Sequence, residues 1–177
     1  DLVQPLLKLY ADSDDAKALG LDEKGLARRC TACGGFGSTR IEMDFLPDVY
    51  VPCETCHGTG YRPEAWDVRW RGLTLPGLTA LTIDEAYEVS RDQEALARPL
   101  SAAWSVGLGY LVLHQPAHTL SGGEAQRLKI AKELCKKAAE ETLYILDEPT
   151  VGQHLEDVAR LIDVLHRLVD VGHTVIV

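Results

Sequence analysis

The chain has 177 residues, with 18 basic and 27 acidic side chains and a formal net charge of −9. A chain of this length can bury one substantial core and a small additional module. The acidic balance argues against nucleic-acid binding by bulk charge attraction. No apolar run reaches the roughly 18 residues that a membrane-spanning helix needs, so we expect no membrane partner.

The first segment, residues 1–29, shows two helical patterns. The acidic stretch over residues 12–15 separates them and is typical of a solvated turn. We interpret residues 1–29 as an N-terminal helical segment.

Two Cys-x-x-Cys pairs open the next segment, residues 30–72. Cys30 and Cys33 form the first pair, Cys53 and Cys56 form the second, and 19 positions separate the pairs. This spacing is typical of a four-cysteine zinc site. Glycines follow each pair in the same register, giving a doubled C-x-x-C-x-G-x-G. Because four thiolates complete a tetrahedron around Zn²⁺, we expect a structural site with no open position for a substrate.

Two disulfides are the alternative for these cysteines. The sequence shows no signal peptide, and disulfides are rare in proteins that are not exported, so we favour zinc. His57 adjoins the second pair. A fifth ligand would crowd a completed four-sulfur site, so we interpret His57 as a solvated neighbour.

The stretch between the two pairs is predicted to be a β-hairpin. Apolar residues alternate with acidic ones over residues 41–45, a turn is expected at 46–48, and an apolar strand returns over 49–51. After the second pair, Arg69 and Arg71 share one face of an expected strand. That face is either a phosphate-contacting surface or a solvated, salt-bridged strand, and the sequence leaves both open.

Residues 73–140 are predicted to be mainly helical. Thr82 and Glu85 have the spacing of a capping box that opens a helix through about Ser90. A second helix is expected over residues 93–108, with Pro99 near its middle.

The sequence Leu-Ser-Gly-Gly-Glu at residues 120–124 is the strongest motif in this segment. Ser121 and Glu124 form a second capping-box pattern. Gly122 and Gly123 lack side chains, so a ligand can approach the backbone closely. The unpaired N–H groups and partial positive charge at a helix start suit a terminal phosphate. The alternative is an ordinary capped helix.

The helix that follows this motif has an apolar face at three- and four-residue steps, which predicts packing against the core. Cys135 lies on that face and is expected to be a small buried residue. The full face is Leu128, Ala131, Leu134, Cys135 and Ala138.

Residues 141–177 begin with an apolar run over 142–146, which predicts a parallel strand buried on both faces. Asp147 and Glu148 follow at its carboxyl end, where ligands bind in open α/β sheets. One carboxylate can hold Mg²⁺ through water, and the next can polarise an attacking water. A solvated acidic turn is the alternative.

An apolar stripe at helical spacing follows, and Gly172 is placed to end that helix. Residues 174–177 begin another β-rich run, so strand, helix and strand predict a right-handed parallel crossover. The stripe consists of Leu155, Val158, Leu161, Ile162, Leu165, Leu168 and Val169.

These motifs together resemble the UvrA family, the damage-sensing ATPases of bacterial nucleotide excision repair. The resemblance rests on CTACGGFG, IEMDFLPDVYVPCETC, VGLGYLVLHQPAHTLSGGEAQRLKIAKEL and TLYILDEPTVGQHLEDVARLIDVLHRLVDVGHTVIV. It runs from Cys30 to the last residue and is weaker over residues 1–29. It implies an α/β fold: part of an ABC-type ATPase (P-loop NTPase) core, with a helical signature region and an inserted zinc-binding β-hairpin.

The resemblance also implies roles for matching residues. Ser121, Gly122, Gly123 and Glu124 would form the signature that meets ATP held by an opposing nucleotide-binding unit. Asp147 would support Mg²⁺ and Glu148 would act as general base, whereas Cys30, Cys33, Cys53 and Cys56 would hold structural Zn²⁺. The cofactors of the whole ATPase would be ATP, Mg²⁺ and Zn²⁺.

The partners implied by the resemblance are damaged double-stranded DNA, an opposing ATPase half, a second copy in a homodimer and a UvrB-like excinuclease subunit. The implied location is the cytoplasm. We expect the zinc hairpin to help the whole protein contact DNA.

Two departures from the family pattern stand out. No G-x-x-x-x-G-K-[ST] phosphate loop occurs in these 177 residues, so we interpret the chain as a fragment that is inactive alone. The sequence Val-Gly-Gln-His at residues 151–154 differs from the family's usual Thr-Gly-Leu-His, which leaves the role of Gln153 open, and we do not assign His154 to catalysis.

Two alternatives to the repair function remain. One is an ABC protein outside repair, either a UvrA-like paralogue in drug self-resistance or a transport motor. The other is a DnaJ-type zinc module without enzymatic activity, which the LSGGE and LDEP sequences disfavour.

Overall fold

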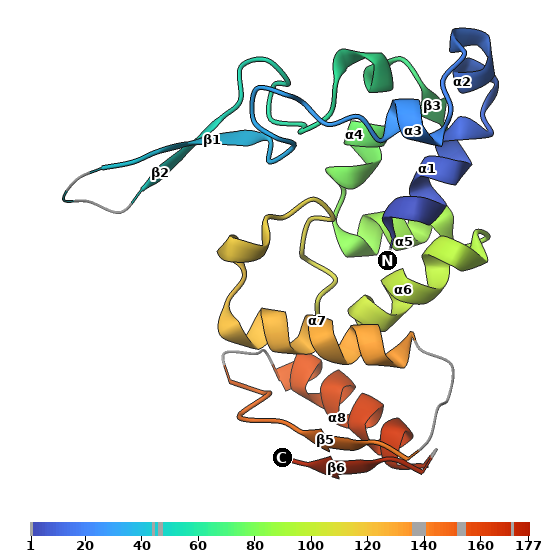
Figure 1. Cartoon of the computed structure of the whole chain (residues 1–177). Coiled ribbons are helices and arrows are strands. Elements are labelled where there is room, and N and C mark those ends of the chain that lie inside the picture. Colours follow the sequence, from blue (N-terminus) through green and yellow to red (C-terminus); the bar gives the residue numbers. More distant parts are fainter. Residues whose placement is uncertain (1, 44, 46–47, 136–140, 152–154, 171) are drawn as a thin grey trace. The chain divides into compact units, whose positions relative to one another are not determined.

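The structure is a computed structural model that describes residues 2–43, 45, 48–135, 141–151, 155–170 and 172–177. The chain divides into two compact units, Asp1–Ala80 and Leu81–Val177 (Figure 1). The sequence predicted four segments, residues 1–29, 30–72, 73–140 and 141–177. This finer division stays a prediction.

Short helices form the core of the first unit. Ser13 caps α2 by accepting the Ala16 N–H at 3.2 Å, and Gly20, at φ +65°, ends that helix. The helices are α1 (Val3–Ala11), α2 (Asp14–Leu19), α3 (Glu23–Leu26), η1 (Pro63–Trp66) and α4 (Leu75–Thr79). They bury Leu6, Leu7, Tyr10, Leu26, Val68, Leu75 and Leu78.

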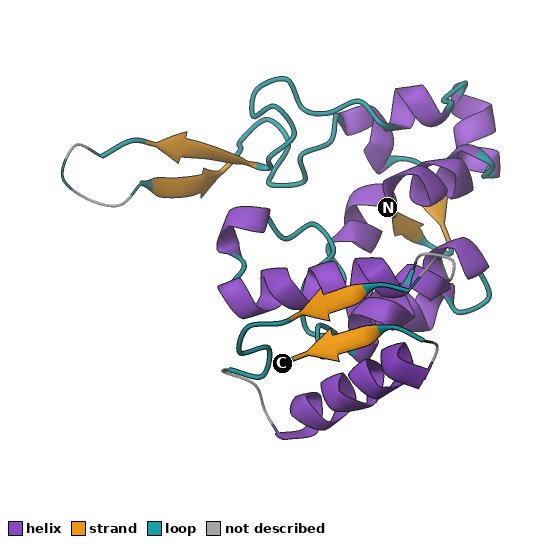
Figure 2. Ribbon diagram, turned by 60° about the horizontal axis from the view of Figure 1, so that its bottom comes forward, coloured by secondary structure: helices purple, strands orange, loops and turns teal. Residues whose placement is uncertain are grey.

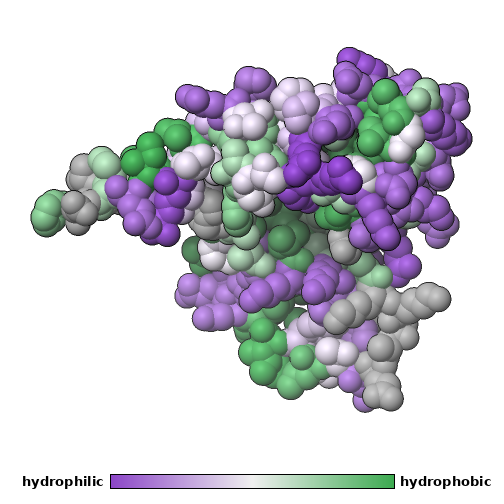
Figure 3. Space-filling view, turned by 45° about the horizontal axis from the view of Figure 1, so that its top comes forward, coloured by the Kyte–Doolittle hydropathy of each residue, from purple (hydrophilic) through white to green (hydrophobic). Residues whose placement is uncertain are grey.

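The predicted β-hairpin is present in the first unit. Strands β1 (Ser38–Ile41) and β2 (Val49–Pro52) pair antiparallel, with Ile41 opposite Val49. The hairpin extends away from the helices of its unit (Figure 1). Its strands are largely exposed, including apolar residues, and hydrophobic atoms lie along the hairpin in Figure 3.

The strand predicted around Arg69 and Arg71 differs in the structure. Strand β3 (Arg69–Trp70) turns back at Arg71 and Gly72, both at positive φ, and pairs with β4 (Leu73–Thr74). Arg71 then lies over the Trp70 ring at 4.5 Å. The prediction of one strand presenting both arginines on a face is therefore wrong, because Gly72 permits a tight turn.

The second unit combines helices with a two-stranded parallel sheet (Figure 2). Strand β5 (Leu143–Ile145) pairs parallel with β6 (Thr174–Ile176), and α8 (Leu155–Asp170) connects them, as predicted. The remaining elements are α5 (Ile83–Ser90), α6 (Glu94–Ser105), η2 (Ala117–Thr119) and α7 (Gly122–Leu134). Among the described residues, no helix is long and apolar enough to cross a membrane.

Local signals in this unit are confirmed. Thr82 forms the predicted capping box with Glu85 at the start of α5. Helix α6 runs through Pro99 as expected. Gly172, at φ +100°, follows α8, where its N–H donates to the Val169 carbonyl at 2.9 Å.

Burial in the second unit differs from the predictions for α7 and β5. Helix α7 buries Arg127, Ile130 and Ala131, while Leu128 on the predicted inner face is exposed. Strand β5 is not buried on both faces, because its sheet has only two strands in the described part of the chain. The apolar stripe that predicted α8 is confirmed as a helix, and it is partly buried: Leu161 and Leu168 are buried with Val164, whereas Leu155, Ile162 and Val169 are exposed. Ala138 of the predicted α7 face lies outside the described residues.

Candidate metal centre and signature site

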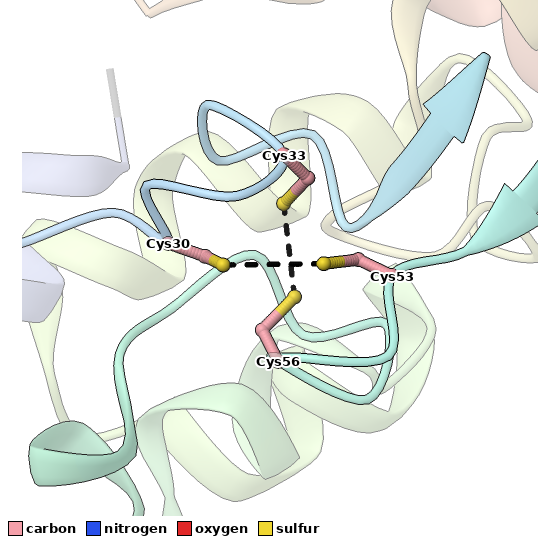
Figure 4. Close-up of side chains that lie close together, drawn as sticks. All are labelled: Cys30, Cys33, Cys53 and Cys56. Carbon is pink, nitrogen blue, oxygen red and sulfur yellow. Dashed lines mark hydrogen bonds between the residues drawn. The ribbon is translucent and has the colours of Figure 1, made fainter.

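The four predicted cysteine ligands meet in the first unit, with their sulfurs pointing toward a common centre (Figure 4). The Cys30 and Cys53 sulfurs are 4.0 Å apart, the Cys33 and Cys56 sulfurs are 3.7 Å apart, and all four lie within 4.8 Å of one another. A tetrahedron with Zn–S bonds of about 2.3 Å has edges of about 3.8 Å. All four residues are buried and none is in a disulfide, so the cluster fits Zn²⁺.

Each cysteine pair is shaped by the glycine four residues after its second cysteine. The Gly37 N–H donates to the Cys33 sulfur, and the Gly60 N–H donates to the Cys56 sulfur, both at 3.3 Å. Both glycines have positive φ, +73° and +74°. Side chains are strained in this conformation, so the repeated glycine in C-x-x-C-x-G-x-G has a local cause.

The two halves of the motif are also bonded crosswise. The Cys30 N–H donates to the Gly60 carbonyl and the Cys53 N–H donates to the Gly37 carbonyl, each at 2.9 Å. A Cβ atom at Gly37 would lie 2.3 Å from the Gly58 carbonyl oxygen. The backbones therefore approach too closely for any side chain at this position.

The cluster holds its thiols in unequal electrostatic surroundings. Hydrogen bonding from the Cys56 backbone, followed by other donors, lowers the pKa of Cys53 to about 7. Burial raises the pKa of the Cys56 thiol to about 11. The directions are opposite because hydrogen-bond donors stabilise the Cys53 thiolate, whereas burial disfavours the Cys56 thiolate. Four adjacent thiolates would repel one another, so a cation is needed before all four can ionise.

His57 is exposed, as predicted, and occupies a positive-φ position at +50°. Its ring lies 5.7 Å from the ring of Trp66, which packs against the four cysteines. Trp66 Nε1 is buried without a hydrogen-bond partner among the described residues. The tryptophan therefore acts as an apolar wall beside the sulfurs.

The signature residues lie at the start of α7 in the second unit. The Ser121 hydroxyl accepts the Glu124 N–H at 3.2 Å, and the Glu124 carboxylate accepts the Ser121 N–H at 2.7 Å. The predicted capping box is therefore formed. Ser121 and Gly122 are exposed, and nothing lies within 4 Å of a Cβ built on Gly122.

The two carboxylates of Asp147 and Glu148 are exposed just beyond β5. Glu148 has φ +43°, and its carbonyl accepts the Val151 N–H at 3.2 Å. A Cβ on Gly123 would lie 3.7 Å from the Val151 carbonyl oxygen. The turn that contains Glu148 thus borders the start of α7. Gln153 and His154 lie outside the described residues.

Cys135 follows α7 as its C-cap and is half-buried, not fully buried as predicted. Burial still raises the pKa of its thiol. It lies in the second unit and takes no part in the four-sulfur cluster.

Two residues at the signature were missed by the sequence reasoning. The Tyr110 hydroxyl donates to Glu124 Oε1 at 2.5 Å. This bond, followed by the Ser121 N–H, lowers the pKa of Glu124, while burial and then Glu124 raise the pKa of Tyr110. Arg127 is only 5% exposed, and its Nε has no partner among the described residues. No spacing rule links residues 14 positions apart, so Tyr110 carried no sequence signal.

The chain was compared with known proteins. Residues 73–151 match the family described as ABC transporter. UvrABC system protein A of Thermus thermophilus is 54% identical over 149 residues, covering 84% of this chain and 16% of that protein. The Bacillus subtilis protein of the same name is 47% identical over 174 residues, covering 96% and 18%.

Among solved structures, the crystal structure of UvrA2 from Deinococcus radiodurans superposes with a TM-score of 0.90 at 44% identity. It is matched over 98% of this chain and 22% of its own length. The chain thus spans less than a quarter of these relatives, with both the cysteine cluster and the signature inside the matched length. The chain belongs to the UvrA family of ABC-type ATPases.

Proposed function

We propose that this chain supplies the signature, the Walker B carboxylates and a zinc module to an ATP-dependent protein that recognises DNA damage in nucleotide excision repair. The proposal is supported by the relatives named UvrABC system protein A and by the combination of a four-cysteine cluster with LSGGE and LDEP in one chain.

The observation that carries the nucleotide role is the open space at Gly122. This glycine has no positive φ, and a Cβ there would meet no atom within 4 Å. The fold of the chain therefore gives no reason for glycine, although glycine within a helix costs up to about 1 kcal/mol relative to alanine. A bare backbone at an exposed helix start suits a phosphate that approaches from outside.

In this proposal each group has a separate role in ATP hydrolysis. The N–H groups at Gly122 and Gly123 donate to the terminal phosphate of ATP bound by an opposing unit. Asp147 would hold Mg²⁺, which when bound would neutralise phosphate charge. Glu148 accepts the proton of the attacking water.

The zinc module has a structural role in the proposal. Cys30, Cys33, Cys53 and Cys56 hold Zn²⁺, which fixes the base of the exposed β1–β2 hairpin. The hairpin helps the whole protein contact distorted duplex DNA. The other proposed partners are a second copy of the protein and a UvrB-like subunit, in the cytoplasm.

The chain alone is proposed to be inactive as an ATPase. A composite site needs a phosphate loop, and none occurs in this sequence. Magnesium-dependent turnover by the isolated 177-residue chain at the rate of the complete protein would contradict this hypothesis.

The decisive test is Glu148→Gln in the complete protein that contains this chain. The amide keeps the size of the side chain but cannot accept the proton, so we expect the ATPase kcat to fall by about 10²- to 10⁴-fold. Glu156→Gln, a matched change at an exposed position on α8, serves as control. If both variants keep the wild-type kcat, the assignment of Glu148 is wrong.

Binding to lesion-bearing duplex tests the repair role separately. A UvrA-like paralogue outside repair is the alternative function. We expect the complete protein to bind a duplex with one bulky lesion more tightly than the same undamaged duplex at fixed salt. Equal affinity for both duplexes would favour the paralogue function.

A further inference from the structure

Both oxygens of the Glu124 carboxylate are hydrogen-bonded, and they serve different parts of the second unit. Oε2 accepts the Ser121 N–H at 2.7 Å, which closes the capping box. Oε1 accepts the Tyr110 hydroxyl at 2.5 Å. The tyrosine therefore fixes the orientation of the carboxylate that shapes the signature turn.

The loop that carries Tyr110 is itself held firmly. The Ile83 N–H donates to the Leu111 carbonyl at 2.9 Å, and the Asp84 N–H donates to the Gly109 carbonyl at 3.0 Å. Leu111 is buried, and a Cβ on Gly109 would lie 2.1 Å from the Asp84 carboxylate. The start of α5 thus fixes the backbone on both sides of Tyr110.

The Tyr110 hydroxyl is not needed to dock α7. That helix already packs through Ile130 and Ala131, each 3% exposed. The bond from Tyr110 instead acts at the first turn, where Gly122 and Gly123 present their N–H groups. A contact that adds little burial but fixes one carboxylate is better suited to orientation than to stability.

We propose that Tyr110 is a positioning residue of the signature. Its hydroxyl fixes Glu124, Glu124 fixes the Ser121 turn, and the turn directs the Gly122 and Gly123 amides at the incoming phosphate. This inference rests on the proposed nucleotide function of the signature and adds to it a residue outside the LSGGE motif.

The experiment measures ATPase kcat and KM of the complete protein with Tyr110→Phe. We expect kcat to fall about five-fold, with KM for ATP changed less than about two-fold, because the nucleotide is held mainly by the opposing unit. Tyr87→Phe, which removes a hydroxyl on α5 of the same unit, should keep the wild-type kcat.

A double-mutant cycle separates positioning from general destabilisation. Because Tyr110 acts through Glu124, Tyr110→Phe should have no further effect on kcat in a Glu124→Ala background. Equal losses in both backgrounds, or a wild-type kcat for Tyr110→Phe, would overturn the inference. Kinetics are normalised to folded protein by circular dichroism, so a loss that comes only from partial unfolding disappears. Tyr110→Phe would then show the wild-type kcat, which counts against the inference.

A third variant tells failure of the inference from failure of the proposed function. Gly122→Asp places a negative charge at the open helix start, where an added Cβ meets no atom within 4 Å, and should abolish turnover. If Gly122→Asp is inactive while Tyr110→Phe has the wild-type kcat, only the inference fails. If Gly122→Asp is fully active, the nucleotide role of the signature fails as well.

Discussion

The two units of the chain place their proposed functional groups in opposite surroundings. In the first unit the four cysteines are at most 8% exposed and meet at one point. In the second unit Ser121, Asp147 and Glu148 are exposed at the surface. A centre whose ligands all come from one chain can be buried, whereas groups that act on a ligand held elsewhere must stay accessible.

Replacing one cysteine of the four-sulfur cluster should have the largest effect on the stability of the chain. We expect Cys56→Ser to lose Zn²⁺ and unfold the first unit, because zinc binding contributes about 10–16 kcal/mol in small zinc peptides. Bound zinc per chain and circular dichroism measure the result. Cys135→Ser, outside the cluster, is the control and should keep its zinc. Full zinc content in Cys56→Ser would remove the contrast between the units.

The second-largest loss of stability should come from Gly37→Ala. The left-handed backbone alone costs about 1–2 kcal/mol, and the contact with the Gly58 carbonyl adds about 1–3 kcal/mol of overpacking. Gly20→Ala is the matched control, since Gly20 has φ +65° but open space around its Cβ position. Denaturant unfolding should show the smaller loss for Gly20→Ala, and equal losses would mean that the close approach is unimportant.

Replacing Gly122 in the second unit should stabilise the chain, in contrast to replacing Gly37. Gly122→Ala should raise the free energy of unfolding by as much as about 1 kcal/mol, because nothing opposes the new methyl group. The ATPase rate of the complete protein should fall. A variant that is less stable, with unchanged turnover, would place Gly122 with Gly37 as a glycine required by the fold.

The smallest effect concerns the capping box of α5. Hydrogen bonds from the Thr82 backbone and hydroxyl lower the pKa of Glu85. A lowered folded-state pKa gives stability that is present above the ordinary carboxyl pKa of about 4.3 and is lost as pH falls through the lower folded value. Thermal unfolding between about pH 6 and 3 should therefore show a steeper loss for wild type than for Glu85→Gln. Parallel curves would contradict the expectation.

Features set by neighbours three or four residues apart could be predicted from the sequence. The capping boxes at Thr82 and Ser121 and the doubled cysteine motif belong to this class, and the structure contains all three. The inner face of α7 could not be predicted, because the buried Arg127 is a residue type expected at the surface. Tyr110 was missed because tertiary folding alone brings it to Glu124.

The crosswise bonds between Cys30 and Gly60 and between Cys53 and Gly37 have a consequence for tolerance to insertion. Each Cys-x-x-Cys turn donates a backbone hydrogen bond to the other, so we expect the two turns to form together. The β1–β2 arm joins the two turns and lies outside these crosswise bonds. We therefore expect the length of the arm to change without disturbing the four-cysteine base, so that the reach of the arm can evolve separately from its anchor.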